Sequence, residues 1–364
     1  YRCESLTMSL FDGADEYRFD RVAGKQAARK EHVGKLLHLE HNGVHHEIFY
    51  THTSVGSKVS RDECERFYLS AAHLLRQKRP DVIISYGGSR FSKSLQQLAR
   101  KNCGQFVFFL ANASYTDRSL FYQSDIVVCP SNFLAGYYRR TLGLTPRVIR
   151  DVVLPYSYIM PETDIGSHGR RRRQGFVTFV NPQRYKGLTL FIRLAGMALQ
   201  TLPRVTFLAV EGRITRERLQ RKGAGVGCEP NVWWLPNQND MRRIYARTSL
   251  LICPSYCAEA SGRVIAEAQL SGIPVLAARR GGIPEQLNGG GYLFEIPKRC
   301  IEDHGLTPTE AEVTPWLETI RMLLHDDTAY ATASDTALKA GSAFSHENGR
   351  DALLAFFKPL LTAD

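Results

Sequence analysis

Acidic, basic and glycine residues gather in the stretch 253–275, which reads CPSYCAEASGRVIAEAQLSGIPV. The pattern predicts a buried strand, a polar loop that carries Glu259, and a helix that begins near Gly262. Glycine at a helix entrance removes the side chain that would block close approach. The amides of Ser261–Val264 are therefore free to meet a phosphate, with the positive end of the helix dipole behind them. The stretch is a candidate anion site.

Glu267 follows Arg263 by four residues, so the two share one face of the expected helix. A carboxylate offers two acceptor oxygens, which suits the two hydroxyls of a ribose. The alternative is a surface ion pair between Arg263 and Glu267. Glu259 has an alternative too, because an acidic residue near a helix start can serve only as a cap.

A second candidate is the loop NPQRYKG after an expected strand at 176–180. Lys186 and Gly187 close this loop, and a lysine there can contact a phosphate. The alternative is an ordinary loop lysine. A third loop, Gly281–Gly282 with Glu285 behind it, is interpreted as either a tight turn or a ligand contact.

Short apolar runs alternate with helical stretches from Asp81 onward, which is typical of parallel sheets wrapped by helices. The first series has expected strands at 81–85, 106–111 and 126–129, with a weaker one at 148–153. The second has strands at 176–180, 205–210, 232–235, 250–253, 274–277 and 292–294, and a helix at 188–200. Upstream we expect a strand at 3–11, a helix at 27–40 and a strand at 46–50, and in the tail helices at 314–324, 328–343 and 348–357. Two doubly wound sheets predict ligand binding at the carboxyl ends of their strands, between the domains.

Length and charge narrow the function classes. A chain of 364 residues predicts two domains of ordinary size. The net charge of +11 favours an anionic partner, and nucleic acid, an anionic membrane face and a sugar nucleotide all qualify. The apolar runs are too short to cross a bilayer and no signal-peptide pattern opens the chain, so we expect a cytoplasmic protein. The eight cysteines lack metal-site spacing, and we expect reduced thiols and no bound metal.

These residues resemble a known family, the retaining GT-B glycosyltransferases of glycosyltransferase family 4, also called glycosyl transferases group 1. Its hallmark is a Glu, seven residues and a second Glu, with a Gly at the helix start and a small residue, Gly, any residue, Pro and Val after the helix. The matching positions here are Glu259, Gly262, Glu267, Ser271, Gly272, Pro274 and Val275, followed by the 281–285 loop and the 289–291 turn. The likeness extends to 177–187 and 125–133.

The resemblance implies an α/β fold of two doubly wound Rossmann-like domains facing across a cleft. It implies an acceptor domain at 1–160, a basic linker at 161–174, a donor domain at 175–343, and a helix at 344–364 that packs back on the first domain. The linker contains the run Arg170–Arg173, which is otherwise an ordinary solvated segment.

The resemblance also implies a site. Lys186 and Glu259 would be the catalytic residues, with Glu259 touching the sugar and Glu267 holding the ribose of a nucleoside-diphosphate sugar. The full implied donor set is Asn181, Arg184, Lys186, Leu235, Ser261, Gly262, Arg263, Val264 and Glu267. Transfer to a hydroxyl would retain the anomeric configuration, with the leaving phosphate as base and no metal or cofactor. Polysaccharide or glycoconjugate synthesis is the implied setting, with contact to an anionic membrane face as an additional expectation and no nucleic acid partner.

The chain departs from the family pattern at three positions. Asn181 replaces a common Arg, Ser261 replaces an aromatic residue, and Asn112 on the acceptor side replaces a common His. Three alternatives to a glycosyltransferase stay open. One is a catalytically inactive GT-B module that binds carbohydrate or protein, and the others are a sugar-nucleotide epimerase and a phosphorylase on the same fold.

Overall fold

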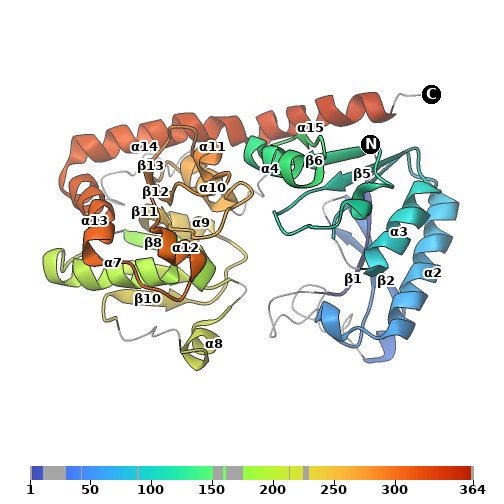
Figure 1. Cartoon of the computed structure of the whole chain (residues 1–364), viewed down its shortest axis with the longest axis horizontal. Coiled ribbons are helices and arrows are strands. Elements are labelled where there is room, and N and C mark those ends of the chain that lie inside the picture. Colours follow the sequence, from blue (N-terminus) through green and yellow to red (C-terminus); the bar gives the residue numbers. More distant parts are fainter. Residues whose placement is uncertain are drawn as a thin grey trace. The chain divides into compact units, whose positions relative to one another are not determined.

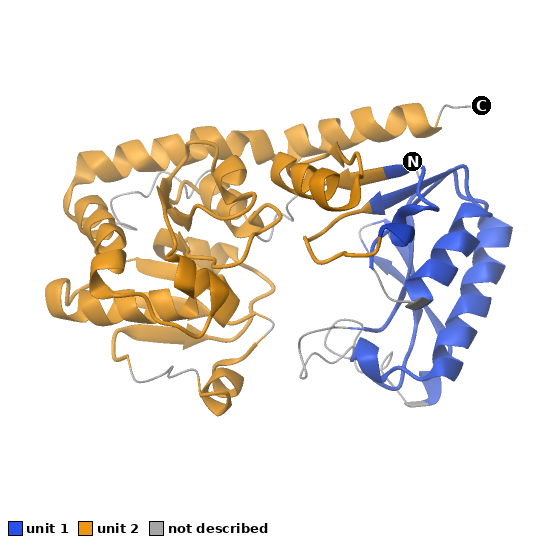
Figure 2. Cartoon of the chain, in the orientation of Figure 1, with its two compact units in different colours: residues 1–108, 118–126 blue, residues 109–117, 127–364 orange. Residues whose placement is uncertain are grey.

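A computed structural model gives the fold. It describes residues 2–10, 30–41, 43–87, 90–150, 159–160, 175–212, 214–223 and 229–361. The chain divides into two compact units (Figure 2): unit 1 holds Tyr1–Phe108 and Arg118–Ile126, and unit 2 holds Phe109–Asp117 and Val127–Asp364. The predicted linker 161–174 lies outside the described residues, so the predicted domain boundary stays a prediction.

Unit 2 contains a six-stranded parallel sheet in the order β10-β9-β8-β11-β12-β13 (Figure 1). Its strands are β8 (Phe176–Val180), β9 (Phe207–Val210), β10 (Val232–Leu235), β11 (Thr248–Cys253), β12 (Val275–Ala278) and β13 (Tyr292–Phe294). All six expected strands are present. The central strand β11 is buried at every position, as expected of a strand covered on both faces.

Helices cover both faces of this sheet. Packed on one face are α7 (Leu188–Thr201), α13 (Glu310–His325) and α14 (Asp327–Gly341), through a core that includes Phe179, Phe191 and Trp316. The other face packs against α9 (Arg242–Tyr245), α10 (Arg263–Leu270) and α11 (Ile283–Leu287). Among the described residues, the other α-helices of this unit are α4 (Asn132–Leu142), α8 (Arg216–Arg221), α12 (Lys298–Glu302) and α15 (His346–Leu361).

Two smaller sheets complete the fold. One has the order β1-β3-β2, from β1 (Glu4–Met8), β2 (Leu36–His41) and β3 (Val44–Phe49). The other has the order β4-β5-β6-β7, from β4 (Val82–Ser85), β5 (Gln105–Phe109), β6 (Ile126–Cys129) and β7 (Arg147–Val148). Their helices are α2 (Arg61–Lys78) and α3 (Arg90–Arg100). The expected helix at 27–40 is wrong in its second half, because Leu36–His41 pairs antiparallel with Val44–Phe49 as a strand.

The C-terminal helix is longer than expected. Its predicted end at Phe357 is wrong, because α15 continues through Pro359 to Leu361. The predicted packing of 344–364 on the first domain stays a prediction. Within the described part of the chain, no helix is long and apolar enough to span a membrane.

Candidate functional site

Two loops at the carboxyl ends of β8 and β11 are bound to each other through their backbones. The carbonyl oxygen of Tyr185 accepts hydrogen bonds from the amides of Tyr256 and Cys257, both at 3.0 Å. Gly187 has φ +88°, and a side chain there would overlap the carbonyl oxygen of Pro254. Only glycine fits this contact. The close approach places Lys186 beside the loop that carries Glu259.

Lys186 and Glu259 form an ion pair between these loops. Their side chains are 22% and 14% exposed, so the pair is largely removed from water. Burial lowers the pKa of Lys186, but the neighbouring Glu259 charge outweighs it and the pKa lies above its ordinary value. Glu259 also accepts a hydrogen bond from the Ser255 hydroxyl at 2.6 Å. The two predicted catalytic residues are therefore in direct contact.

The thiols next to this pair are neutral. Burial raises the pKa of Cys257 to about 11 and that of Cys253 to about 12. All seven cysteines in the described residues are free. In the same residues, no group of His, Cys, Asp and Glu could hold a metal ion.

The Gly281–Gly282 turn supports the Glu259 loop from behind. The amide of Gly282 donates to the carbonyl oxygen of Glu259 at 2.8 Å. Side chains at the two glycines would overlap the backbone of Glu259 and Ala260. The tight-turn interpretation therefore explains why glycines occupy both positions.

Helix α10 begins at a glycine in the left-handed region. Gly262 has φ +93° and is the N-cap, so no cap side chain covers the first turn of the helix. Ser261 is buried and Arg263 is exposed. This geometry leaves the first-turn amides of Arg263 and Val264 without a cap side chain from Gly262, as an anion site requires.

Glu267 is 6% exposed, and its Oε2 accepts a hydrogen bond from the fully buried hydroxyl of Tyr245 at 2.6 Å. The alternative of a surface ion pair with Arg263 does not fit, because the Glu267 side chain is buried. Tyr245 comes from α9, so the contact ties two helices on one face of the sheet.

Three other predicted donor residues lie at the end of a strand or in the loop after one in unit 2. Asn181 follows β8 with φ +59°, and its Oδ1 accepts from Gln183 at 2.9 Å. Leu235 ends β10. Arg184 is exposed and donates to the carbonyl oxygens of Lys222 and Gly223 at 3.2 and 3.0 Å. In this structure Arg184 is bound at the end of α8.

Asn112, the acceptor-side candidate, is held within its loop. Its Oδ1 accepts from the amide and hydroxyl of Ser114 at 3.0 and 2.5 Å. Its carbonyl oxygen accepts from the Tyr138 hydroxyl of α4 at 2.7 Å. The loop is thus anchored to a helix before any ligand binds.

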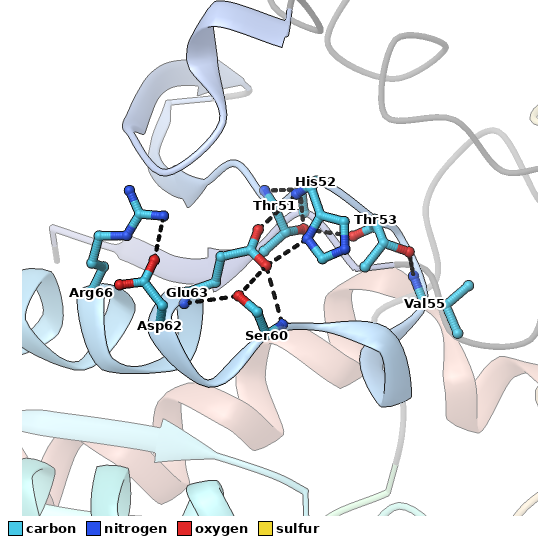
Figure 3. Close-up of polar contacts among 9 residues, drawn as sticks. Thr51, His52, Thr53, Val55, Ser60, Asp62, Glu63 and Arg66 are labelled. Carbon is cyan, nitrogen blue, oxygen red and sulfur yellow. Dashed lines mark hydrogen bonds and ion pairs between the residues drawn. The ribbon is translucent and has the colours of Figure 1, made fainter.

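A second polar network lies in unit 1, at the start of α2, and sequence reasoning missed it. Glu63, 3% exposed, accepts from the His52 amide at 2.8 Å, from the His52 ring at 2.5 Å and from Ser60 (Figure 3). Burial alone would raise the pKa of Glu63, but the hydrogen bonds from His52 and Ser60 lower it to about 2. An ionised carboxylate only accepts, so the His52 Nδ1 carries the proton.

Sequence reasoning also missed Ser255, Tyr245 and Glu285 as partners in unit 2. Ser255 precedes Glu259 by four residues, a spacing that could have suggested the contact. Tyr245 reaches Glu267 from another helix, and Glu285 reaches the start of α4 from α11. No local pattern in the sequence marks these contacts.

A segment of unit 2 is similar to a known protein family. Residues 171–326 match the family model described as glycosyl transferases group 1. Curated relatives named D-inositol 3-phosphate glycosyltransferase are 27% identical in Mycobacterium marinum and 28% in Mycobacterium tuberculosis, each over 222 residues and 58% of this chain. The match covers 44% and 42% of those relatives, so the chain spans less than half of their length.

Two solved structures share the fold over nearly the whole chain. Anabaena Alr3699/HepE, solved with UDP and glucose, is 18% identical with a TM-score of 0.63, covering 98% of this chain and 100% of that one. Sucrose-phosphate synthase from Thermosynechococcus elongatus is 16% identical with a TM-score of 0.70, covering 100% of both chains.

The fold is therefore the GT-B fold of glycosyltransferases, with two Rossmann-like domains. Within this fold class, residues 171–326 are similar to the glycosyl transferases group 1 family.

Proposed function

We propose that the chain transfers a sugar from a nucleoside-diphosphate sugar to a hydroxyl group, with unit 2 binding the donor. The observation that carries the proposal is the partly buried Lys186–Glu259 pair next to the helix start at Gly262. The chain's net charge of +11 suits an anionic donor. Solved structures of Alr3699/HepE hold UDP and UDP-glucose, which supports a uridine nucleotide as the first donor to test.

The pair suggests how donor binding and chemistry are linked. Without donor, Glu259 balances the charge of Lys186. A diphosphate that binds Lys186 and the first amides of α10 supplies that balance instead and releases the Glu259 carboxylate to accept hydrogen bonds from sugar hydroxyls. When the bond to phosphate breaks, the same positive groups stabilise the departing oxygen without reorientation.

Glu267 completes the donor site in this proposal. The Tyr245 hydroxyl holds one of its oxygens. The carboxylate retains further acceptor capacity, which suits a ribose diol. Retention of the anomeric configuration, independence from metal and peripheral contact with an anionic membrane face remain parts of the proposal that follow from the family resemblance and the charge.

The test measures UDP release from UDP-glucose by wild-type protein and by Lys186→Ala and Glu259→Gln. We expect slow donor hydrolysis in the wild type, and a drop of about 100-fold in each variant, as is usual when one charge-stabilising group is removed. Lys298→Ala is the matched control, because Lys298 is 89% exposed on α12. It should leave the rate unchanged.

Other outcomes would replace the proposal. Tight UDP-glucose binding without turnover, with or without added hydroxyl compounds, indicates a binding module. Interconversion of the sugar without UDP release indicates an epimerase. Turnover that requires inorganic phosphate indicates a phosphorylase.

A further inference from the structure

Helix α4 is bound at its start to the loop of Glu259. The Ser131 hydroxyl, 2% exposed, donates to the carbonyl oxygen of Ala260 at 2.5 Å, directly after Glu259. Ser131 is also the N-cap of α4 and accepts from the amide of Leu134 at 3.2 Å. A single buried hydroxyl therefore joins the first turn of α4 to the backbone of the candidate catalytic loop.

Glu285 closes the rest of this helix start. Its Oε1 accepts from the amide of Asn132 at 3.0 Å and from the side chain of Asn132 at 2.7 Å, and its Oε2 accepts from the amide of Phe133 at 3.2 Å. The carboxylate also lies at the positive end of the α4 dipole. Because Glu285 follows the Gly281–Gly282 turn that packs on Glu259, it fixes α4 and the catalytic loop together.

The same helix is bound, two turns later, to the loop of Asn112. The hydroxyl of Tyr138, which is fully buried, donates to the carbonyl oxygen of Asn112 at 2.7 Å and accepts from the amide of Tyr115 at 3.1 Å. Burial raises the pKa of Tyr138 to about 12, so the phenol stays neutral and can make both bonds. The rings of Tyr115 and Tyr138 also pack together, with centroids 6.3 Å apart.

Ser131, Leu134, Ala135 and Tyr138 are all buried, so one face of α4 carries both attachments. Seven residues of α-helix span about 10 Å, and a helix transmits displacement along its axis because its backbone bonds are satisfied internally. Residues 109–117, α4 and the Glu259 loop all belong to unit 2.

We propose that α4 couples the loop of Asn112 to the loop of Glu259, with Tyr138 and Glu285 as positioning residues at the two attachments. The inference rests on the proposed function, in which Glu259 contacts the donor sugar, and on the family resemblance, which implies that Asn112 lies on the acceptor side. The helix then sets where an acceptor hydroxyl is held relative to the reacting sugar, a positioning effect on which transfer rates depend strongly.

Hydrogen exchange followed by mass spectrometry tests the coupling without any substrate. Tyr138→Phe removes only the hydroxyl and should speed exchange in 109–117. Glu285→Gln weakens the bonds at the other attachment, and should speed exchange both in 258–262 and in 109–117, by about threefold or more, because the loosened helix opens as one local unit. Tyr137→Phe is the matched control, being the same change on the neighbouring residue of α4.

The coupling is overturned if Glu285→Gln changes exchange only at 258–262 and the start of α4 while 109–117 exchanges as in the wild type. It is also overturned if Tyr137→Phe matches Tyr138→Phe. If Glu285→Gln does not fold, Ser131→Ala replaces it at the same attachment. Faster exchange in both 258–262 and 109–117 then supports the coupling, and a change confined to 258–262 and the start of α4 overturns it.

The turnover number kcat and the Kd for UDP, measured together, distinguish coupling from a purely structural role. On the full chain with UDP-glucose, Tyr138→Phe and Glu285→Gln should each lower kcat by about threefold to tenfold while the Kd for UDP stays within about twofold of wild type. The double variant should lose less than the product of the two single losses, because both act through one helix. Multiplicative losses overturn the coupling.

Failure of the inference and failure of the proposed function are distinguishable. If the wild type neither binds nor turns over sugar nucleotides, the proposed function is wrong, and the exchange data still decide whether α4 couples the loops. If the wild type turns over UDP-glucose and exchange in 109–117 ignores Glu285→Gln, the inference alone is wrong.

Discussion

Helices α2 and α10 differ in how their first turns are capped: side chains cap the start of α2, and none caps the start of α10. Ser60 and Glu63 form a capping box that closes α2, and Glu63 adds two bonds from His52. Helix α10 begins at Gly262, which has no side chain to offer. The difference teaches that a closed start contributes to stability, whereas an open start leaves its amides to a ligand.

Other helices of unit 2 begin in both ways, since α7 at Gly187 has no cap side chain while several others are capped. Thr215, Thr309 and Asp326 accept backbone hydrogen bonds at the starts of α8, α13 and α14. The start of α4 is closed by Ser131 and Glu285. Variants that close the open start or open the closed one therefore test the comparison.

The largest effect on stability is expected from Glu63→Gln. The neutral amide has one acceptor oxygen and an NH2 donor in place of the other, so it loses charge-assisted bonds from His52 and Ser60. The loss should cost about 2 kcal/mol in the free energy of unfolding. Urea unfolding measures the loss. Glu65→Gln is the matched control, because Glu65 is 62% exposed on the same helix. Affinity for UDP should stay unchanged in both variants, and a loss there would mean that the α2 start serves the donor.

The pH dependence of the same variant has a definite sign. The pKa of Glu63 is about 2 in the folded chain against an ordinary value of 4.5. Its charge therefore stabilises the fold fully above pH 4.5, and this contribution is lost as the pH falls toward 2. The stability difference between wild type and Glu63→Gln should shrink across that window. A difference that stays constant down to pH 2.5 would assign the effect to packing.

At the open start, Gly262→Ala should lower the affinity for UDP by about tenfold, because a non-glycine residue at φ +93° is strained and shifts the amides that would meet the diphosphate. Its new Cβ would lie 3.2 Å from the end of the Ile265 side chain, a contact that can relax. Titration calorimetry with UDP measures the change. Gly196→Ala on α7 is the control, since space is open there and UDP affinity should not change. Unchanged affinity in Gly262→Ala would remove α10 from the donor site.

The sequence predicts the elements that depend on local patterns better than those that depend on pairing with another segment. Strands at 126–129, 176–180, 232–235 and 292–294 have the expected bounds, because each is a short apolar run of a parallel sheet. The predicted helix at 27–40 is wrong over residues 36–40, because their pairing with the strand at 44–49 outweighs a helical spacing of apolar residues.

The candidate site divides likewise. Lys186, Gly262 and Glu259 were predictable because their loops carry family motifs beside recognisable strands. Tyr245 and Glu285 were not, because their partners lie 22 and 153 residues away in the chain and only folding brings them together. Sequence patterns report residues that repeat locally, and they say nothing about which distant side chain holds a carboxylate in place.

The smallest effect is expected from Arg184→Ala. Arg184 binds the C-terminal end of α8, a helix with hydrogen-bonding side chains at both of its ends. Thr215 caps the start of α8, and Arg184 donates to the carbonyl oxygens of Lys222 and Gly223 after its end. Losing exposed bonds of this kind costs about 0.5–1 kcal/mol in stability. UDP affinity should fall by less than about threefold, because the Arg184 guanidinium donates to carbonyl oxygens and is not placed to bind a phosphate. A tenfold loss in calorimetry would show that donor binding draws Arg184 from α8 into the site, and that two cations, with Lys186, hold the diphosphate beside the open helix start.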